Sequence, residues 1–465
     1  MLPAPKYQSP LKNIRVLDLS RVFAMPFAGA NLADLGAEVI KIDTCQAQFM
    51  DTTRTLTGPF PDNQPGELWW EQGGTFQNLN RGKRSLTLDL RSEESQKIIK
   101  ELVRVCDVVL ENFTPRVMAR FGLDFKSLQA EKPDLVMVSN TGYGHSGPWS
   151  SFGAMASALE PTHGTGAFMG YMEEGADGRL AEGQVPNKMG NSYSDFLATW
   201  TALGALMAAL LRRARTGEGQ WIDLAMYQTG TTVIGTGVLD FVFNQRRTQR
   251  IGNRHPFWSP HGVYPCQGHD QWVSIVARHD GDWQAVCQAM DMPELASDPR
   301  FADPIDRRQH QEELDEIIAA WTSARTSYQA MDSLQEAGAP AGAVLTAKQT
   351  LTDPQYLDRG FFETVYNPPE VGLRPKGYVG RGWKFSKSKA EIRGPAPRLG
   401  EANDYVLGEL LGIDQARLKT FAGDWTIGNL PEGGRAPGAV PLDEQVELGW
   451  IAEYHADYLD RLPPV

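Results

Sequence analysis

Short apolar strands alternate with helical stretches through the first 145 residues, and this alternation restricts the folds that the chain can adopt. Helical patterns at 26–35 and 92–105 separate some of these strands. Strands joined by helices pair in parallel, because a crossover helix returns the chain to the same end of the sheet. The pattern therefore predicts an α/β fold with a doubly wound parallel sheet. The expected strands are 14–19, 38–43, 85–90, 107–111 and 135–139.

The later part of the chain predicts a second, smaller domain. A long helix at 194–215 and a strand at 220–226 complete the first pattern, and strand and helix signals begin again near residue 256. The tail has a linker-like, Gly-rich stretch at 433–438 and then a helical pattern at 442–459. The predicted domains are the first part of a large domain at 1–225, a linker at 226–255, a small α/β domain at 256–365, a return to the large domain at 366–422, and a C-terminal tail at 423–465.

Charge and cysteine content disfavour several classes of protein. The formal net charge of −12 argues against general nucleic-acid binding and against docking on an anionic membrane. No run of 18 apolar residues is present, and the first six residues lack the apolar region of a secretory signal. The four cysteines, Cys45, Cys106, Cys266 and Cys287, are far apart and form no CxxC pair. We therefore expect packed, reduced thiols, no clustered zinc site and a cytoplasmic location.

The common catalytic and nucleotide-binding motifs are missing from the sequence. The loop after the first strand, 20–26, contains no GxGxxG, and no GxxxxGK[ST] occurs anywhere in the chain. HExxH and GxSxG are also absent. These absences disfavour a nicotinamide dehydrogenase, a P-loop NTPase, a zinc metalloprotease and an α/β-hydrolase.

Five ordered blocks of sequence carry a family resemblance. They are 10–19 with 32–42, 80–85 with 88–90, 107–113, 216–220 and 396–401. Together they resemble the class III CoA-transferase family, which also contains carnitine CoA-transferases, formyl-CoA transferases and α-methylacyl-CoA racemases. The resemblance covers roughly residues 10–410. It implies a Rossmann-like large domain with a smaller inserted domain, and two identical chains interlocked as rings. It also implies that an acyl-CoA and a carboxylic acid are the substrates, without a metal ion.

The resemblance places the catalytic aspartate at Asp195, at the start of the long helix. Its carboxylate would attack the thioester to give an aspartyl anhydride, which CoA thiolate would convert into an aspartyl-CoA thioester. A helix N-terminus suits an ionised carboxylate and a developing oxyanion. Taken alone, an aspartate in a first helical turn is more simply a stabilising residue. Ser192 or Ser194 is then expected to cap the helix.

The resemblance also assigns residues to the CoA path, at or just beyond the carboxyl ends of sheet strands. For the arginines the alternative role is a solvated surface charge, and Phe113 could equally pack in the core. The predicted CoA-binding residues are Arg21, Val22, Phe23, Ala24, Leu88, Arg91, Asn112, Phe113, Arg120 and Phe121.

Two other functions stay open from the sequence. An α-methylacyl-CoA racemase would use Asp195 as a base, but the His-Asp pair of those relatives is missing from 151–160, so Glu160 or His163 would have to supply the second base. The chain could also be an inactive CoA-binding subunit of a hetero-oligomer. The bulky segment 253–258 suggests an acid larger than oxalate, with Arg254 or His255 as a partner for its carboxylate.

Overall fold

The computed structural model of the chain has two compact units and describes residues 9–55, 58–171, 187, 190, 192–423 and 426–457. The first unit comprises Met1–Thr165, Met189–Thr236 and Gln355–Val465. The second comprises Gly166–Lys188 and Gly237–Pro354. The segment 226–255, expected to be a linker, holds the helices α10 (Met226–Thr231) and α11 (Gly235–Asn244).

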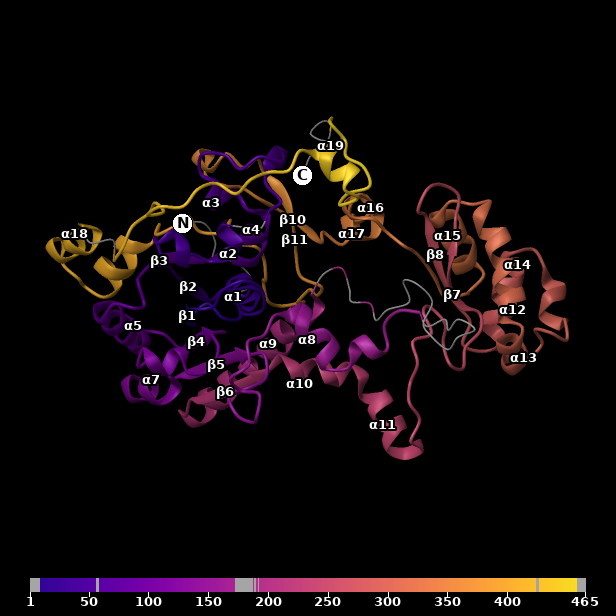
Figure 1. Cartoon of the computed structure of the whole chain (residues 1–465), viewed down its shortest axis with the longest axis horizontal. Coiled ribbons are helices and arrows are strands. Elements are labelled where there is room, and N and C mark those ends of the chain that lie inside the picture. Colours follow the sequence, from indigo (N-terminus) through magenta and orange to yellow (C-terminus); the bar gives the residue numbers. More distant parts are fainter. Residues whose placement is uncertain are drawn as a thin grey trace. The chain divides into compact units, whose positions relative to one another are not determined.

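A six-stranded sheet forms the centre of the first unit (Figure 1). The strands lie in the order β3-β2-β1-β4-β5-β6, and every neighbouring pair is parallel. The predicted α/β class with a parallel sheet is therefore confirmed. The strand order changes direction between β1 and β4, which is the switch point where open α/β sheets bind ligands. The strands are β1 (Arg15–Asp18), β2 (Glu38–Asp43), β3 (Arg84–Thr87), β4 (Val108–Glu111), β5 (Val136–Thr141) and β6 (Gln220–Ala225).

Helices cover both faces of this sheet. Val16 and Leu17 are neighbours on β1 that point to opposite faces, and both are fully buried. Val16 belongs to a core cluster with residues of α1 and α9, whereas Leu17 belongs to one with residues of α5, α7 and α18. The apolar character of the strands follows, because neither face meets water. These helices are α1 (Ala24–Asp34), α5 (Glu93–Val105), α7 (Phe125–Glu131), α9 (Tyr193–Thr216) and α18 (Gln415–Gly423).

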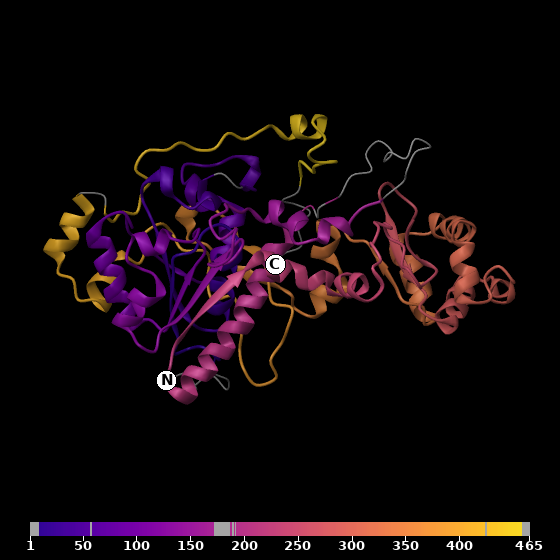
Figure 2. The ribbon, with the colours of Figure 1, turned by 60° about the horizontal axis from the view of Figure 1, so that its bottom comes forward.

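The long helix α9 runs beside the sheet (Figure 2). Among the described residues it is the one helix whose length and composition would also suit a membrane span. Leu203, Leu206 and Ala209 are buried in the core cluster that includes α1, as expected for a core helix of a globular unit. Gly217 ends the helix in a left-handed conformation, with φ of 74°.

Shorter elements complete the first unit. The helix predicted at 442–459 is formed only by α19 (Leu442–Glu447); Gly449, at φ of 67°, turns the chain away, and 458–459 lie outside the described residues. The others are α2 (Thr52–Thr55), α3 (Trp69–Gln72), α4 (Gly74–Asn80), α6 (Val117–Arg120), α8 (Ala156–Thr162), α17 (Pro354–Asp358), β10 (Phe362–Val365) and β11 (Lys376–Val379).

The second unit has its own antiparallel sheet and hydrophobic core. Trp283, Phe301 and Ile318 are among its fully buried side chains. The strands are β7 (His261–Pro265), β8 (Trp272–Val276) and β9 (Ala341–Ala343). The helices are α12 (Asp280–Ala289), α13 (Pro304–Gln309), α14 (Gln311–Ser323), α15 (Ser327–Glu336) and α16 (Ala347–Thr352).

Candidate active site

Two loops meet at the switch point of the six-stranded sheet. Arg21 follows β1 and Asn112 follows β4, on strands that are neighbours in the sheet. The backbone N–H of Arg21 donates to Asn112 Oδ1 at 2.9 Å, and Asn112 Nδ2 donates to the Arg21 carbonyl at 2.8 Å. The Arg21 guanidinium lies over the ring of Phe113, 5.7 Å from its centroid. The reciprocal bonds fix the two loops against each other.

Val22 adopts a left-handed backbone conformation in the first of these loops. Its φ is 67°, which is costly for a β-branched residue and marks a conformation imposed by its surroundings. The Val22 N–H points between the two carboxylate oxygens of Asp51, at 3.3 Å from each. Lys41 pairs with Asp51 at 3.1 Å and also donates to the Ser20 carbonyl at 3.0 Å. A buried ion pair therefore holds the strained loop in place.

Asp195 lies in the first turn of α9 and lines a cavity of about 350 Å³ at this edge of the sheet. The cavity is also lined by Val22, Phe23, Asn112 and Phe113. Ala24, at the start of α1, accepts a hydrogen bond from Thr199 Oγ1 at 2.7 Å, which fastens α1 to α9 one turn beyond Asp195.

The expected serine cap of α9 is not formed. Ser192 occupies the N-cap position but its side chain caps no backbone N–H, and the buried Ser194 hydroxyl has no partner among the described residues. That prediction was wrong, because the chain enters the helix with Ser192 at ψ of 87°, outside both the extended and the helical regions. The first turn is thus without a side-chain cap beside the carboxylate.

Burial and a second carboxylate shift the pKa of Asp195. Burial is the larger cause and the charge of Glu160 the second, and together they raise the pKa of Asp195 to about 7. Glu160, on α8, is 2% exposed, and neither of its carboxylate oxygens has a hydrogen-bond partner in the part of the chain that the structure describes. Two poorly solvated carboxyl groups thus lie close together, and no ion pair joins either of them to a cation among the described residues. At neutral pH only part of the Asp195 population is ionised.

Some predicted CoA-binding residues lie away from this cavity. Leu88, the residue after β3, is buried in the core, and Phe121 packs partly against the same core. Arg120 is exposed at the end of α6. Arg91 lines a different and larger cavity. Phe113 both lines the Asp195 cavity and packs against the core. The role of each in binding CoA stays a prediction.

Sequence reasoning missed Asp51 altogether and considered Glu160 only as a racemase base. Asp51 follows β2 in a stretch without a recognisable motif, and its bond to Val22 joins residues 29 apart. In the sequence, Glu160 stands out only as the one charged residue of the helix α8. Its closeness to Asp195 depends on the packing of α8 against α9.

The segment expected to meet a substrate carboxylate has partners inside the second unit. His255 Nδ1 accepts hydrogen bonds from the N–H groups of Phe257 and Trp258, both at 3.2 Å. Its ring stacks on Trp258, with centroids 4.0 Å apart. Arg254 pairs with Asp315 at 3.5 Å. These contacts shape the segment, and a role in substrate binding stays a prediction. In the described ranges no group of three or more His, Cys, Asp or Glu is placed to hold a metal ion.

The fold and the site together define an α/β protein in which a buried carboxylate, Asp195, lines a cavity at the sheet edge where such folds bind ligands. Residues 11–403 match CoA-transferase family III. The chain is 35% identical over 410 residues to succinyl-CoA–D-citramalate CoA-transferase of Chloroflexus aurantiacus, covering 88% of this chain and 96% of that protein. It is 32% identical over 415 residues to succinate–glutarate CoA-transferase of Agrobacterium fabrum, covering 89% and 99%.

Solved structures agree with the sequence comparisons. The crystal structure of a CAIB/BAIF family protein from Brucella suis superposes with a TM-score of 0.73 at 30% identity, over 87% of this chain and all of that chain. The chain belongs to CoA-transferase family III. The predicted family and enzyme class are therefore confirmed.

Proposed function

We propose that this protein transfers CoA from a dicarboxylic acyl-CoA, such as succinyl-CoA, to a second dicarboxylic acid, with Asp195 as the nucleophile. The observation that carries the proposal is the Asp195 carboxylate lining a cavity at the switch point of the sheet. The named substrates of the relatives, citramalate and glutarate beside succinyl-CoA or succinate, support the choice of a dicarboxylate acceptor. Both acids are larger than oxalate.

The reaction needs one activated carboxylate and no net proton transfer. An oxygen of ionised Asp195 attacks the thioester carbonyl carbon, the C–S bond breaks, and CoA leaves as the thiolate. The thiolate then attacks the Asp195 carbonyl carbon of the anhydride, which releases the donor acid as its carboxylate and leaves an aspartyl-CoA thioester. The acceptor carboxylate repeats the two steps in reverse order and regenerates Asp195.

The surroundings of Asp195 suit this role. A carboxylate in water is a weak nucleophile, whereas one that is poorly solvated is less stabilised in its charged state and attacks more readily. The pKa of about 7 expresses that destabilisation. At the same time the group is ionised in a sizeable fraction of molecules at neutral pH. Burial and Glu160 together therefore make the Asp195 carboxylate more reactive while leaving a sizeable fraction of it ionised at neutral pH.

Replacing Glu160 by glutamine tests this tuning. The substitution removes the neighbouring charge, so the pKa of Asp195 falls and the acidic limb of the kcat/KM profile moves to lower pH. The rate of transfer at pH 8 falls as well. Without the neighbouring negative charge, the ionised Asp195 carboxylate is less destabilised and is therefore a weaker nucleophile. Rates measured from pH 5 to 9 provide the readout. An unchanged acidic limb would show that Glu160 does not act on Asp195.

A direct assay tests the proposed reaction. The protein is incubated with succinyl-CoA and a panel of dicarboxylates, and new acyl-CoA products are measured by mass spectrometry. Hydroxylamine or borohydride trapping then locates the activated carboxyl at Asp195. Deuterium entering the α-carbon of a methyl-branched acyl-CoA without an acceptor acid, in place of transfer, would identify a racemase. The absence of both reactions would favour an inactive CoA-binding subunit.

We also propose that the protein is a homodimer. Helix α11 has no buried residue, and its apolar side chains are 44–76% exposed. A contiguous apolar face of this kind marks a protein interface. These side chains are Val238, Leu239, Phe241, Val242 and Phe243. Light scattering at micromolar concentration is expected to give twice the chain mass of 51.4 kDa, and Phe243→Ser is expected to weaken the dimer. A monomeric wild-type protein would contradict the proposal.

A further inference from the structure

The C-terminal tail crosses the first unit as an extended segment, 426–440, which we call the strap. Figures 1 and 2 show it in yellow, running from α18 to α19. The family match ends at residue 403, so the strap lies beyond the part that the family shares. It is held at its start by Thr87, whose Oγ1 donates to the Gly428 carbonyl at 2.8 Å and accepts from the Gly428 N–H at 2.9 Å.

The middle of the strap pairs with the chain just after β2. The Glu432 N–H donates to the Cys45 carbonyl at 2.6 Å, and the Ala47 N–H donates to the Glu432 carbonyl at 3.3 Å. Further on, Asn63 Nδ2 donates to the Val440 carbonyl at 2.7 Å. The residues from 433 to 438 therefore span a gap between two anchored points.

Gly434 shows how closely the strap approaches the domain. Its φ is 82°, and a Cβ at this position would lie 2.7 Å from the Cβ of Ala47. Since real Cβ atoms do not come so close, a side chain at this position would push the strap away from Ala47. The close packing of the strap on the first unit therefore depends on glycine at position 434.

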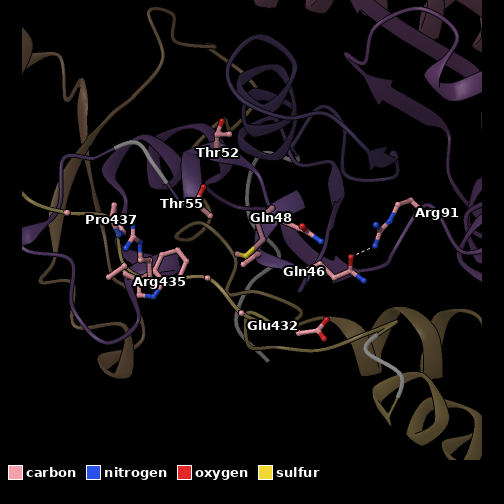
Figure 3. Close-up of a pocket in the computed structure, with 15 residues that line it drawn as sticks. Gln46, Gln48, Thr52, Thr55, Arg91, Glu432, Arg435 and Pro437 are labelled. Atoms are coloured by element: carbon pink, nitrogen blue, oxygen red, sulfur yellow. Dashed lines mark hydrogen bonds between the residues drawn. The ribbon is translucent and has the colours of Figure 1, made fainter.

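A cavity of about 1300 Å³ lies under the strap (Figure 3). Residues 432–438 form one wall, and Gln46, Gln48, Trp69 and Arg91 belong to the rest. The volume exceeds the usual range of about 300–1,000 Å³ for small-molecule pockets, so it accepts a nucleotide-sized ligand. It lies beyond the carboxyl ends of β2 and β3, at the same sheet edge as Asp195.

Two arginines face this cavity from different walls. Arg91 donates to Asp89 Oδ2 at 2.9 Å and lies over the Phe49 ring at 4.2 Å, so its position is fixed. Arg435, on the strap, has no hydrogen bond or ion pair with any described residue. In Figure 3 the two guanidinium groups lie at opposite sides of the cavity. An unpaired guanidinium lining a large cavity calls for an anionic ligand.

Asp51 connects this cavity with the catalytic one. Its neighbours Met50 and Thr52 line the cavity under the strap, while its own carboxylate accepts the N–H of Val22, which lines the Asp195 cavity. A ligand that extends past Asp51 could place its nucleotide end in the cavity under the strap and its thioester end in the Asp195 cavity.

We propose that the strap forms part of the CoA site of this chain, and that Arg435 binds a phosphate of the nucleotide end of CoA. The proposal rests on the proposed CoA-transferase function. It assigns to the tail a role in substrate binding: the strap closes the cavity from outside and supplies a second cation, which lies beyond residues 11–403, the part that matches the family.

Binding of CoA to the full-length protein tests the proposal by calorimetry. The Arg435→Ala variant is expected to raise the Kd for CoA about tenfold, since a charge-assisted hydrogen bond to phosphate is lost. Arg435→Lys keeps the charge and is expected to recover most of the affinity. A succinyl-pantetheine thioester, which lacks the nucleotide, is expected to react equally fast with both variants. Dephospho-CoA distinguishes the two phosphate sources: an equal loss indicates the pyrophosphate, and a smaller loss the 3′-phosphate.

Two further variants separate the seating of the strap from its charge. Gly434→Ala is expected to weaken CoA binding because it displaces the strap. Gly412→Ala is the matched control: Gly412 has a similar φ of 72°, its Cβ would meet nothing within 4 Å, and it lies outside the strap and the cavity, so this variant is expected to bind CoA normally. A Kd for CoA within twofold of wild type in Arg435→Ala would overturn the proposal, as would a change only in the KM of the acceptor acid. If the wild-type protein bound no CoA, the proposed function would fail with it.

Discussion

Asp195→Ala is expected to lower kcat for CoA transfer by a factor of about 10⁴ or more, because the proposed covalent intermediates form on the carboxylate that the substitution removes. The first bond of the proposed reaction is made by the Asp195 carboxylate, and alanine offers no atom for it. CoA binding is expected to stay within a few-fold of wild type, since the nucleotide end lies in a separate cavity under the proposal for the strap. Product formation and trapping with succinyl-CoA provide the two measurements.

The stability of the same variant provides a control for folding. The pKa of Asp195 in the folded chain, about 7, lies above its ordinary value of 3.8, so the folded state binds its proton more tightly than the unfolded state. Wild-type stability is therefore reduced as pH rises from about 4 to 7, and the full cost is present above pH 7. Asp195→Ala removes this cost, and its unfolding temperature is expected to exceed that of wild type at pH 8 but not at pH 4.

Glu93 supplies a matched control for Asp195→Ala. It is an exposed carboxylate in the first turn of α5, so Glu93→Ala loses only a favourable interaction with the helix dipole, about 0.3–1 kcal/mol. Its turnover is expected to equal that of wild type. Turnover by Asp195→Ala within a hundredfold of wild type would contradict the nucleophile assignment.

Arg54→Met is expected to destabilise the protein by about 3–5 kcal/mol, because it leaves two buried carboxylates without their cation. The guanidinium is fully buried and pairs with Asp43 at 3.1 Å and with Glu71 at 2.7 Å. Burial alone would raise the pKa of Asp43, but Arg54 and Lys41 hold the pKa of that carboxyl below its ordinary value. Urea unfolding of both proteins measures the difference in free energy.

The effect of Arg54 extends beyond the ion pairs. Its guanidinium lies 3.6 Å from the centroid of the Phe76 ring and donates to the Pro397 carbonyl at 2.9 Å. It therefore ties the returning segment near residue 397 to the helices that follow β2. A matched control is Arg84→Met, since Arg84 is half-exposed and pairs with Glu38 at 3.1 Å. That change is expected to cost less than about 1 kcal/mol. Equal losses in the two variants would refute the role of burial.

Local patterns in the sequence were sufficient for the elements of the sheet. The stretch at 38–43 became β2 with the same bounds, because Val39, Ile40 and Ile42 pack into the cores on the two faces of the sheet. The buried charges of Lys41 and Asp43 on the same strand are paired with Asp51 and Arg54. The helix around 194–215 and its stop at Gly217 also follow from local spacing and from the conformational freedom of glycine. Ordered sequence blocks predicted the family, and the resemblance placed Asp195 at the start of this helix, where the structure has it in the first turn.

The tertiary structure decided the contacts between residues that are far apart in the chain. Arg21 and Asn112 are separated by 91 residues, and Arg54 and Pro397 by 343. The pairing of Glu432 with the chain after β2 and the closeness of Glu160 to Asp195 are of the same kind. No local period encodes such contacts, because they depend on the order of strands and on which loops then meet at one edge of the sheet. The sequence by itself therefore determined the elements and the family, and it predicted Asp195 as the nucleophile. The strand order at the switch point, the strained loop at Val22, the raised pKa of Asp195 and the cavity under the strap arose only when those elements packed together.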